Sequence, residues 1–483
     1  MKTYYSSLGR AKAILSLLSL AILTSSAPLA RADSPSETLE KAIYSEETKG
    51  DIDGAMALYQ QVIEQGKSSQ ALAAQAQYRL GVCQYKKRSY SAATASFEAV
   101  IKDYPDQKEL VAMAREYLAR NNDLLPAPWA DGEEERWDIK LAGGLKLGFG
   151  VLTADAAESH GQKIWRFGLL MSATGSGQAS HVEVDASTMK PIHSVWKHSL
   201  LGEANTVYAS DHADVKMTGK EDVGKILLDG PVYDNEEGYQ LFRRLPLAQG
   251  YKSTIPVFSS LGSGSIRLNV EVTGTETVTV PAGTFPCYRL DLHIGQVFWI
   301  STNALREIVK IEGGGVTIEL TGVRRRDPSD PVNYVDPDGF SLTTPPGWAI
   351  GPLVHEKTNV ALLLLDPALT GNCSLAWSSL EIIEPKSATN SVRALLEKET
   401  AEAATQYKNL HVRADSWQDR IVAGQPAMSV IADYMDGDKP KISYGVTTIM
   451  AGHGGAFRFL VPAADFEAFR PTLDAIVNSF KLK

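Results

Sequence analysis

Histidines are the side chains of this sequence best suited to proton transfer or metal binding near neutral pH. Nine are present, and His181, His193, His198 and His212 lie within a stretch of 32 residues. If His193 and His198 share a strand, their odd spacing places them on opposite faces of the sheet, so they cannot bind one metal ion together. The spacing of these histidines therefore does not predict a metal site.

Two histidines have neighbours that bear on chemistry. Asp211-His212 with Asp214 could form a surface metal site, but the same residues are typical of a solvated turn. His453 lies in the flexible stretch 452–455, and no carboxylate beside it would orient its ring for proton transfer.

Motifs of common enzyme classes are absent. The sequence contains no His-Glu-x-x-His, no Cys-x-x-Cys, no phosphate-binding Gly-x-x-x-x-Gly-Lys-Ser/Thr and no Gly-x-Ser-x-Gly. Gly262-Ser263-Gly264-Ser265 precedes a predicted strand, where a turn explains it better than a phosphate site. We therefore predict no catalytic, cofactor-binding or metal-binding residues and no cofactor.

The charge of the chain argues against nucleic acid as a partner. It has 48 Lys and Arg against 57 Asp and Glu, and its first 32 residues hold four of the basic residues and no acidic one, so residues 33–483 carry a formal net charge of −13. Such a chain repels phosphate backbones.

The N-terminus has the pattern of a secretory signal peptide. Lys2, Arg10 and Lys12 precede an apolar run from Ala13 to Leu23, and Ala30-Arg31-Ala32 fits a cleavage site. The apolar run is too short to span a bilayer core of about 30 Å, and no later segment is long and apolar enough. We expect residues 1–32 to be removed near Ala32, which leaves a bacterial periplasmic or secreted protein without a transmembrane segment.

Residues 33–125 are predicted to form helices, because Ala, Leu, Gln, Glu and Lys dominate and breakers are few. An internal sequence repeat supports a prediction of stacked helical hairpins. Four positions recur 38 residues later with similar side chains: Ile52, Ala55, Tyr59 and Val62 correspond to Tyr90, Ala93, Phe97 and Val100.

This region resembles the tetratricopeptide repeats of exported bacterial envelope proteins. The residues that carry the resemblance, and that we expect to pack the repeat, are Leu80, Gly81, Ala93, Phe97 and Pro105. Small residues at 81 and 93 would let the paired helices approach, Phe97 would fill the space between them, and Pro105 would end the second helix. The resemblance implies either a concave surface that docks an envelope protein or peptide, or a purely structural appendage.

A linker over 126–136 leads into a predicted β domain over 137–326. Apolar residues at 266, 268, 270 and 272 alternate with polar ones, and Gly313-Gly314-Gly315 separates two strand-like runs in a hairpin pattern. Many adjacent antiparallel strands with one apolar face predict a large curled sheet. Arg324-Arg325-Arg326 at its end is interpreted as a solvated domain edge and not as a binding patch.

The β domain also resembles a family of exported bacterial domains without an assigned activity. The resemblance is carried by the runs 241–247, 280–285 and 298–301 with Gly250. That family is similar to the lipoprotein-carrier fold, an incomplete antiparallel barrel around an apolar cavity. It implies binding of a lipid or another apolar ligand, whereas an ordinary filled core would give the same pattern.

After a second linker over 327–338, residues 339–483 are predicted to form an α/β domain. Its opening stretches 339–342 and 345–348 and its closing stretch 476–480 resemble PsbP-like domains, which are α/β/α sandwiches on an antiparallel sheet. Domains of this type generally bind or assemble and do not catalyse.

The sequence thus predicts a multidomain α+β protein: helical hairpins, a curled open-barrel-like antiparallel sheet, and an α/β/α sandwich. The function that follows is a non-enzymatic interaction protein of the cell envelope. Two alternatives stay open, namely a lipid or lipoprotein carrier acting through the middle domain, and a hydrolase or metal enzyme using the middle-domain histidines.

Overall fold

The computed structural model describes residues 33–66, 69–87, 89–118, 124–218, 224–228, 230–262, 264–337, 339–379 and 391–482. The predicted signal peptide, residues 1–32, lies outside them. The chain divides into two compact units, residues 1–76 and 77–483. Among the described residues, no helix is long and apolar enough to cross a membrane.

The first unit is helical. It contains α1 (Pro35–Tyr44), a π-helical turn η1 (Ser45–Lys49), α2 (Ile52–Gln65) and the start of α3 (Gln70–Lys86). Ser34 and Glu37 form a capping box that satisfies backbone N–H groups at the start of α1. The Tyr59 hydroxyl, buried in α2, donates a hydrogen bond of 2.6 Å to Glu46.

The second unit begins with the rest of α3, followed by α4 (Tyr90–Asp103) and α5 (Lys108–Tyr117). Phe97 of α4 is buried and stacks on Tyr117 of α5 with ring centroids 4.5 Å apart. A Cβ atom at Gly81 of α3 would lie 2.7 Å from the Phe97 ring. Leu80 and Ala93 are buried, and Pro105 follows the end of α4.

A 15-stranded sheet follows these helices, in the order β8-β7-β6-β5-β4-β3-β2-β1-β15-β14-β13-β12-β11-β10-β9. Its strands are β1 (Glu133–Leu141), β2 (Lys146–Ser159), β3 (Gln162–Ala173), β4 (Ser176–Asp185), β5 (Pro191–His198), β6 (Gly202–Tyr208), β7 (His212–Met217), β8 (Gly224–Leu227), β9 (Tyr233–Asp234), β10 (Lys252–Ser259), β11 (Gly264–Val280), β12 (Gly283–Asp291), β13 (Gln296–Ser301), β14 (Ile308–Gly313) and β15 (Val316–Arg325).

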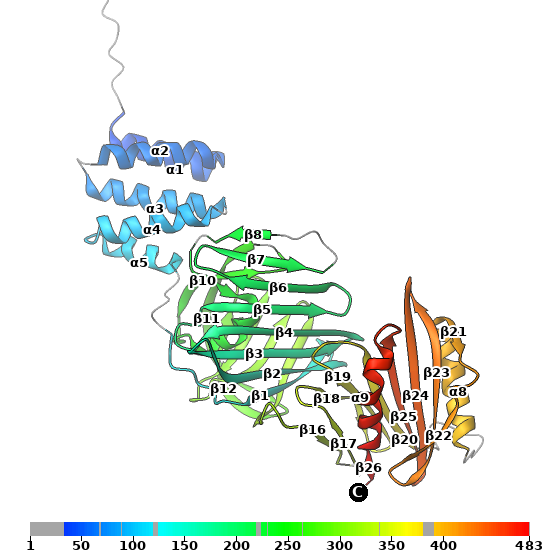
Figure 1. Cartoon of the computed structure of the whole chain (residues 1–483). Coiled ribbons are helices and arrows are strands. Elements are labelled where there is room, and N and C mark those ends of the chain that lie inside the picture. The colour runs from blue at the N-terminus through cyan, green and yellow to red at the C-terminus, as the bar shows by residue number, and fades with distance from the viewer. Residues whose placement is uncertain are drawn as a thin grey trace, which may run out of the picture. The chain divides into compact units, whose positions relative to one another are not determined.

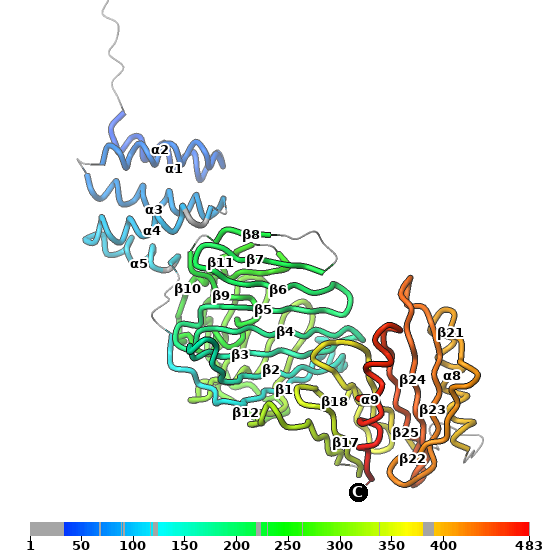
Figure 2. The backbone as a smooth tube through the Cα atoms, viewed as in Figure 1, coloured from blue at the N-terminus to red at the C-terminus, as the bar shows by residue number. Residues whose placement is uncertain are grey.

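Neighbouring strands of this sheet run antiparallel, except that β9 and β10 are parallel. Figures 1 and 2 show neighbouring strands of this sheet side by side. The expected hairpin joins β14 to β15, and Gly314 and Gly315 both have positive φ, as a tight two-residue turn requires. The predicted curled and open antiparallel sheet is confirmed, since β8 and β9 end it without pairing to each other.

The interior of the curled sheet is filled by side chains. A 3-10 turn, η3 (Asn235–Glu237), leads into the short helix α6 (Gly238–Arg244). Leu241 and Phe242 of α6 share one core with Trp137 of β1, Phe167 of β3 and Ile300 of β13. Because both halves of the sheet pack against α6, the sheet wraps around this helix.

The C-terminal region contains two smaller sheets. One has three strands, β16 (Val332–Val335), β17 (Phe340–Thr344) and β26 (Lys481–Leu482). The other has the strands β18 (Ala349–Glu356), β19 (Asn359–Leu365), β20 (Asn372–Ser379), β21 (Lys408–Val412), β22 (Gln418–Val422), β23 (Gln425–Asp436), β24 (Lys439–Met450) and β25 (His453–Pro462).

Two helices cover opposite faces of the larger C-terminal sheet. A Cβ atom at Gly445 would lie 3.5 Å from Leu396 of α8 (Val392–Gln406). The preceding residue, Tyr444, donates a hydrogen bond of 2.6 Å to Asp474 of α9 (Phe466–Asn478). Successive residues of a strand point to opposite faces, so α8 and α9 lie on different sides. The predicted α/β/α sandwich is confirmed (Figure 1).

The close approach at Gly81 gives a first prediction. In Gly81→Val, the added side chain overlaps the Phe97 ring, and overpacking of this kind costs about 2 kcal/mol. Peptides of α4 and α5 should then exchange amide hydrogens at least tenfold faster, as followed by mass spectrometry. The control Ala95→Val adds the same branched side chain at an exposed position of α4 and should leave exchange unchanged. Equal exchange in both variants would show that Gly81 does not determine the packing.

Candidate functional site

A cleft of about 990 Å³ lies over strands β2 to β6, on the face of the large sheet that points away from its core. Arg324 and Arg325 at the end of β15 extend its floor, and further lining comes from residues 326–328, 330–333, 347–349 and 367–368. We call it the outer-face cleft. It is enclosed on two sides by segments far apart in the sequence.

Three rows of outward side chains cross the strands, and all their members except Asn205 and Val207 line the floor of the cleft. Alternation along each strand selects the outward residues, and the register aligns them. The first row is Val151, Leu170, Ala179, Lys197 and Glu203. The second row is Thr153, Gly168, His181, Val195 and Asn205. The third row is Asp155, Arg166, Glu183, His193 and Val207.

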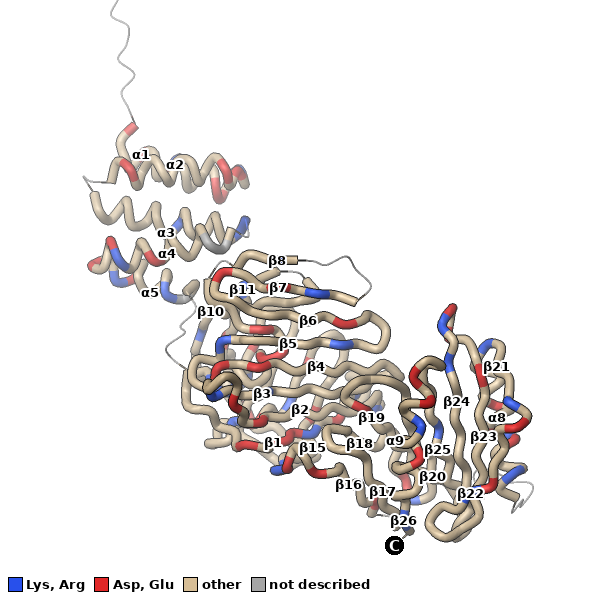
Figure 3. Tube along the Cα trace, viewed as in Figure 1, with Lys and Arg blue, Asp and Glu red and all other residues tan. Residues whose placement is uncertain are grey.

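Ion pairs join the third row to the end of β15. Arg166 donates to Glu183 at 2.6 Å, and Arg326 donates to Asp155 at 2.8 Å. Glu134 of β1 accepts from Arg324 at 2.7 Å. Acidic and basic residues are interspersed on these strands (Figure 3). The arginine run that we interpreted as a solvated edge therefore lines the cleft, and strand pairing between β1 and β15 places it there.

Two imidazoles face each other across β4 and β5 in this cleft. The ring centroids of His181 and His193 are 5.8 Å apart, and His193 Nε2 lies 3.2 Å from Asn205 Oδ1. Burial, followed by the charge of His193, lowers the pKa of His181. His193 lies near His198 in the sequence, but strand register places its ring beside that of His181.

The other candidate histidines lie apart from the cleft lining. His198 is on β5 but stacks on Trp196, with centroids 5.8 Å apart. His212 faces Asp211 at 2.6 Å and Asp214 at 3.4 Å, so a carboxylate lies against each ring nitrogen. His453 stacks on Trp377 at 5.3 Å. In the part of the chain that the structure describes, no group of three or more His, Cys, Asp or Glu side chains is arranged to hold a metal ion.

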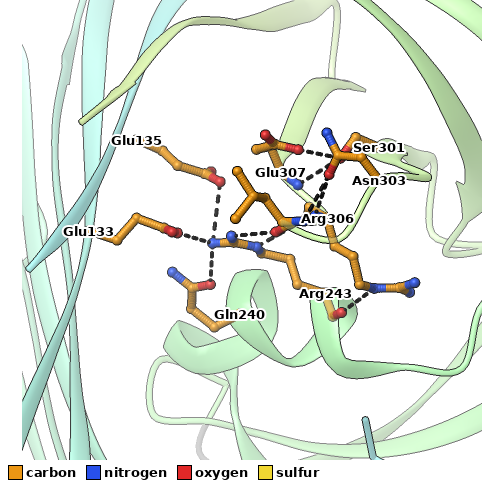
Figure 4. Close-up of polar contacts among 9 residues, drawn as sticks. Glu133, Glu135, Gln240, Arg243, Ser301, Asn303, Arg306 and Glu307 are labelled. Carbon is orange, nitrogen blue, oxygen red and sulfur yellow. Dashed lines mark hydrogen bonds and ion pairs between the residues drawn. The ribbon is translucent and has the colours of Figure 1, made fainter. Parts of the chain in front are cut away.

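A second polar cluster lies inside the curled sheet (Figure 4). The guanidinium of Arg243 in α6 is fully buried, with its Nη1 2.8 Å from Glu133 and 3.2 Å from Glu135 of β1. Nη1 also donates to Gln240 at 2.8 Å. Arg243 further donates to the backbone carbonyls of Arg306 and Leu305. These bonds tie α6 to β1 and to the turn before β14.

The turn before β14 is held by its own polar contacts. Arg306 donates back to the backbone carbonyl of Arg243 and to that of Leu245 at 2.6 Å. The Ser301 hydroxyl donates to Glu307 and to Asn303. Arg243 lies in the stretch 241–247 that carried the family resemblance, so this stretch forms the connection between helix and sheet.

Glu135 is a buried carboxyl whose charge is only partly compensated. Burial raises its pKa to about 7, and although Arg243 acts in the opposite direction, Glu133 and Glu307 add to the rise. The predicted linker 126–136 ends earlier than expected, because β1 begins at Glu133. Three consecutive glutamates show no alternation of apolar and polar residues, so the sequence contains no sign of a strand here.

The raised pKa gives a second prediction. The folded state keeps a proton on Glu135 that the unfolded state releases above its ordinary pKa of 4.5, so stability falls as the pH rises from about 4.5 to about 7. Glu135→Gln should remove this loss, which is at most on the order of 3 kcal/mol. Urea unfolding of the full chain at pH 5 and pH 7.5, followed by tryptophan fluorescence, measures it. The control Glu158→Gln, at an exposed position of β2, should lose the same unfolding free energy between pH 5 and pH 7.5 as the wild type. If Glu135→Gln also loses the wild-type amount, the raised pKa of Glu135 is contradicted.

Comparison with known proteins identifies two regions of the chain. Residues 136–321 match the family model described as Protein of unknown function (DUF3108), and residues 75–106 match a tetratricopeptide repeat model. No curated protein matches the chain.

Three solved structures are similar to parts of the chain. A PsbP protein of the cyanobacterium Synechocystis sp. PCC 6803 is 16% identical over 32% of this chain and 94% of its own, with a TM-score of 0.27. A beta-barrel-like protein of the domain of unknown function DUF1849 from Brucella abortus is 10% identical over 40% of this chain and 98% of its own, with a TM-score of 0.28. LpqN of Mycobacterium tuberculosis, involved in cell envelope biogenesis, is 13% identical over 32% of this chain and 90% of its own, with a TM-score of 0.23.

No residue role or activity is carried over from these proteins. The expected resemblances to a tetratricopeptide repeat and to a domain family without assigned activity are confirmed. The resemblance to PsbP-like domains stays a prediction. The chain therefore combines a tetratricopeptide repeat at residues 75–106 with a middle domain at 136–321 that matches the DUF3108 family of unknown function.

Proposed function

We propose that this protein is an exported, non-enzymatic binding protein of the cell envelope, with a ligand site in the outer-face cleft and helical repeats that dock a protein partner. The observation that carries the proposal is the cleft itself. Its volume of about 990 Å³ is at the upper end of the range typical of small-molecule sites.

The surroundings of the cleft histidines support binding over catalysis. The Nε2 atom of His193 lies 3.2 Å from the amide oxygen of Asn205, a neutral partner that orients the ring. Burial and the neighbouring imidazole lower the pKa of His181, so this ring is a weak base at neutral pH. Both rings are suited to hydrogen bonding with a ligand.

The filled interior of the sheet bears on the lipid-carrier alternative. A carrier of the expected type would hold its ligand inside the curled sheet, where α6 and its core lie. The buried Arg243 occupies the same interior, and removing its contacts with Glu133 and Glu135 would be costly. These observations favour a ligand site on the outer face.

The helical region supports the second half of the proposal. Tetratricopeptide repeats are stacked helical hairpins with extended binding surfaces, and residues 75–106 match such a repeat. Met113 in the middle of α5 is an exposed apolar side chain, with 41% of its surface accessible. It is a suitable position for probing a docked partner.

Site-specific cross-linking in the periplasm gives a third prediction. A photoreactive phenylalanine at Val195 in the cleft should capture a discrete ligand or partner, and one at Met113 should capture a protein. The control position is Ile421 of β22, which is 66% exposed and distant in sequence from both regions. It should give only the diffuse background of random collisions. If Val195 and Met113 give the same background as Ile421, the binding role is wrong.

A further inference from the structure

Ion pairs gather along one edge of the outer-face cleft. The carboxylate of Glu134 contacts three guanidinium groups: Arg136 at 2.6 Å, Arg324 at 2.7 Å and Arg326 at 3.6 Å. Two further carboxylates, Asp155 and Glu183, pair with Arg326 and Arg166. The lining of the whole cleft holds five Lys and Arg and six Asp and Glu, so an anion would be held by individual guanidinium groups and not by an overall positive charge.

In two of these pairs the arginine is more exposed than its carboxylate partner. The Arg324 side chain is 43% exposed, whereas Glu134 is 4% exposed. Arg166 is 49% exposed, whereas its partner Glu183 is 19% exposed. A molecule entering the cleft therefore meets guanidinium edges, with the carboxylates beneath them.

These arginines keep hydrogen-bonding capacity. Arg324 contacts Glu134 through Nε and Nη2, and Arg166 contacts Glu183 through the same two atoms, so each Nη1 group stays outside the ion pair. The planar guanidinium fork matches carboxylate and phosphate oxygens. His181 adds an imidazole N–H that can donate to an anion. Nε2 of His193 faces the amide oxygen of Asn205, so its Nδ1 can accept from a hydroxyl group of the same ligand.

The shape of the floor leaves room for more than a bare ion. Gly168 lies in the middle row between Arg166 and Leu170, and a Cβ there would come within 2.7 Å of Thr153 Oγ1. The floor at this point is therefore formed by backbone and a short hydroxyl side chain. Together with the cleft volume, this favours an organic molecule of sugar size next to the arginines.

We propose that the outer-face cleft binds a small organic oxyanion, a molecule of sugar size that carries a phosphate or carboxylate group. Arg166 and Arg324 hold the anionic group, and His181 and His193 bind its neighbouring oxygens. This inference rests on the proposed binding function and names the ligand chemistry of the same site.

Calorimetric titration of the mature chain, residues 33–483, gives a fourth prediction. The probes are glucose 6-phosphate and glucuronate, which carry the two kinds of anion, with glucose as the neutral control and inorganic phosphate as the bare ion. At least one charged sugar should bind tenfold or more tighter than glucose. It should also bind at least tenfold tighter than inorganic phosphate, because the cleft holds the organic body as well.

Variants locate the binding. Arg166→Gln and Arg324→Gln should each weaken the charged sugar at least tenfold, since each removes a charge-assisted contact. Arg393→Gln is the matched control, because Arg393 is 53% exposed and pairs with a single glutamate, Glu397, on α8. Arg324→Lys keeps the positive charge but lacks the paired N–H donors of the guanidinium group. It replaces Arg324→Gln in the titration if Arg324→Gln lowers the melting temperature.

Three results would overturn the inference. These are equal binding of glucose and the charged sugars, equal binding of inorganic phosphate and the charged sugars, and cleft variants that bind like Arg393→Gln. If these results occur while the cross-linker at Val195 still captures a discrete species, the ligand chemistry is wrong and the ligand site stands. If the cross-linker also captures nothing, the proposed function fails with it.

Discussion

The buried contact between Arg243 and the carboxylates of Glu133 and Glu135 is the interaction on which the arrangement of the β domain depends. It joins α6 to the central strand β1 from inside the curled sheet. Removing one partner of a buried ion pair leaves an uncompensated charge, whereas the intact pair itself adds little net stability. We therefore assign this contact to fixing where α6 sits and not to raising stability.

The same strand connects the interior to the cleft. Along β1, Glu133 and Glu135 point inward to Arg243, whereas Glu134 and Arg136 point outward, where Glu134 pairs with Arg324 of β15. Successive residues of the stretch 133–136 therefore face the interior and the cleft in turn, and both sides of β1 carry charged contacts. Because α6 closes the interior, the outer face is the surface of the sheet that is left for a ligand.

Much of the fold could be predicted from local patterns. The sequence repeat with a spacing of 38 residues indicated the helical hairpins, and the alternation of apolar and polar residues along 266–272 indicated strands. Gly314-Gly315 marked the turn between β14 and β15. The candidate site could not be predicted in this way. Alternation assigns a residue to a face but does not say which strand lies beside it, and register is set by turns and bulges.

Two pairs in the cleft illustrate this limit. Glu134 and Arg324 are 190 residues apart and meet only because β1 pairs with β15. His181 and His193 meet through the pairing of β4 with β5, where a bulge between Glu183 and Val184 shifts the register. An arginine run next to prolines is also typical of a solvated linker, so the sequence alone favoured that interpretation for 324–326.

Anomalous diffraction from crystals soaked in selenate tests the central claim most directly, because selenate is an oxyanion whose position can be seen without bias from the protein. The account predicts a selenium peak in the outer-face cleft, within hydrogen-bonding reach of Arg166 and Arg324, that is lost in the double variant Arg166→Gln/Arg324→Gln. Selenate bound elsewhere on the chain, with the cleft empty at saturating concentration, would contradict it.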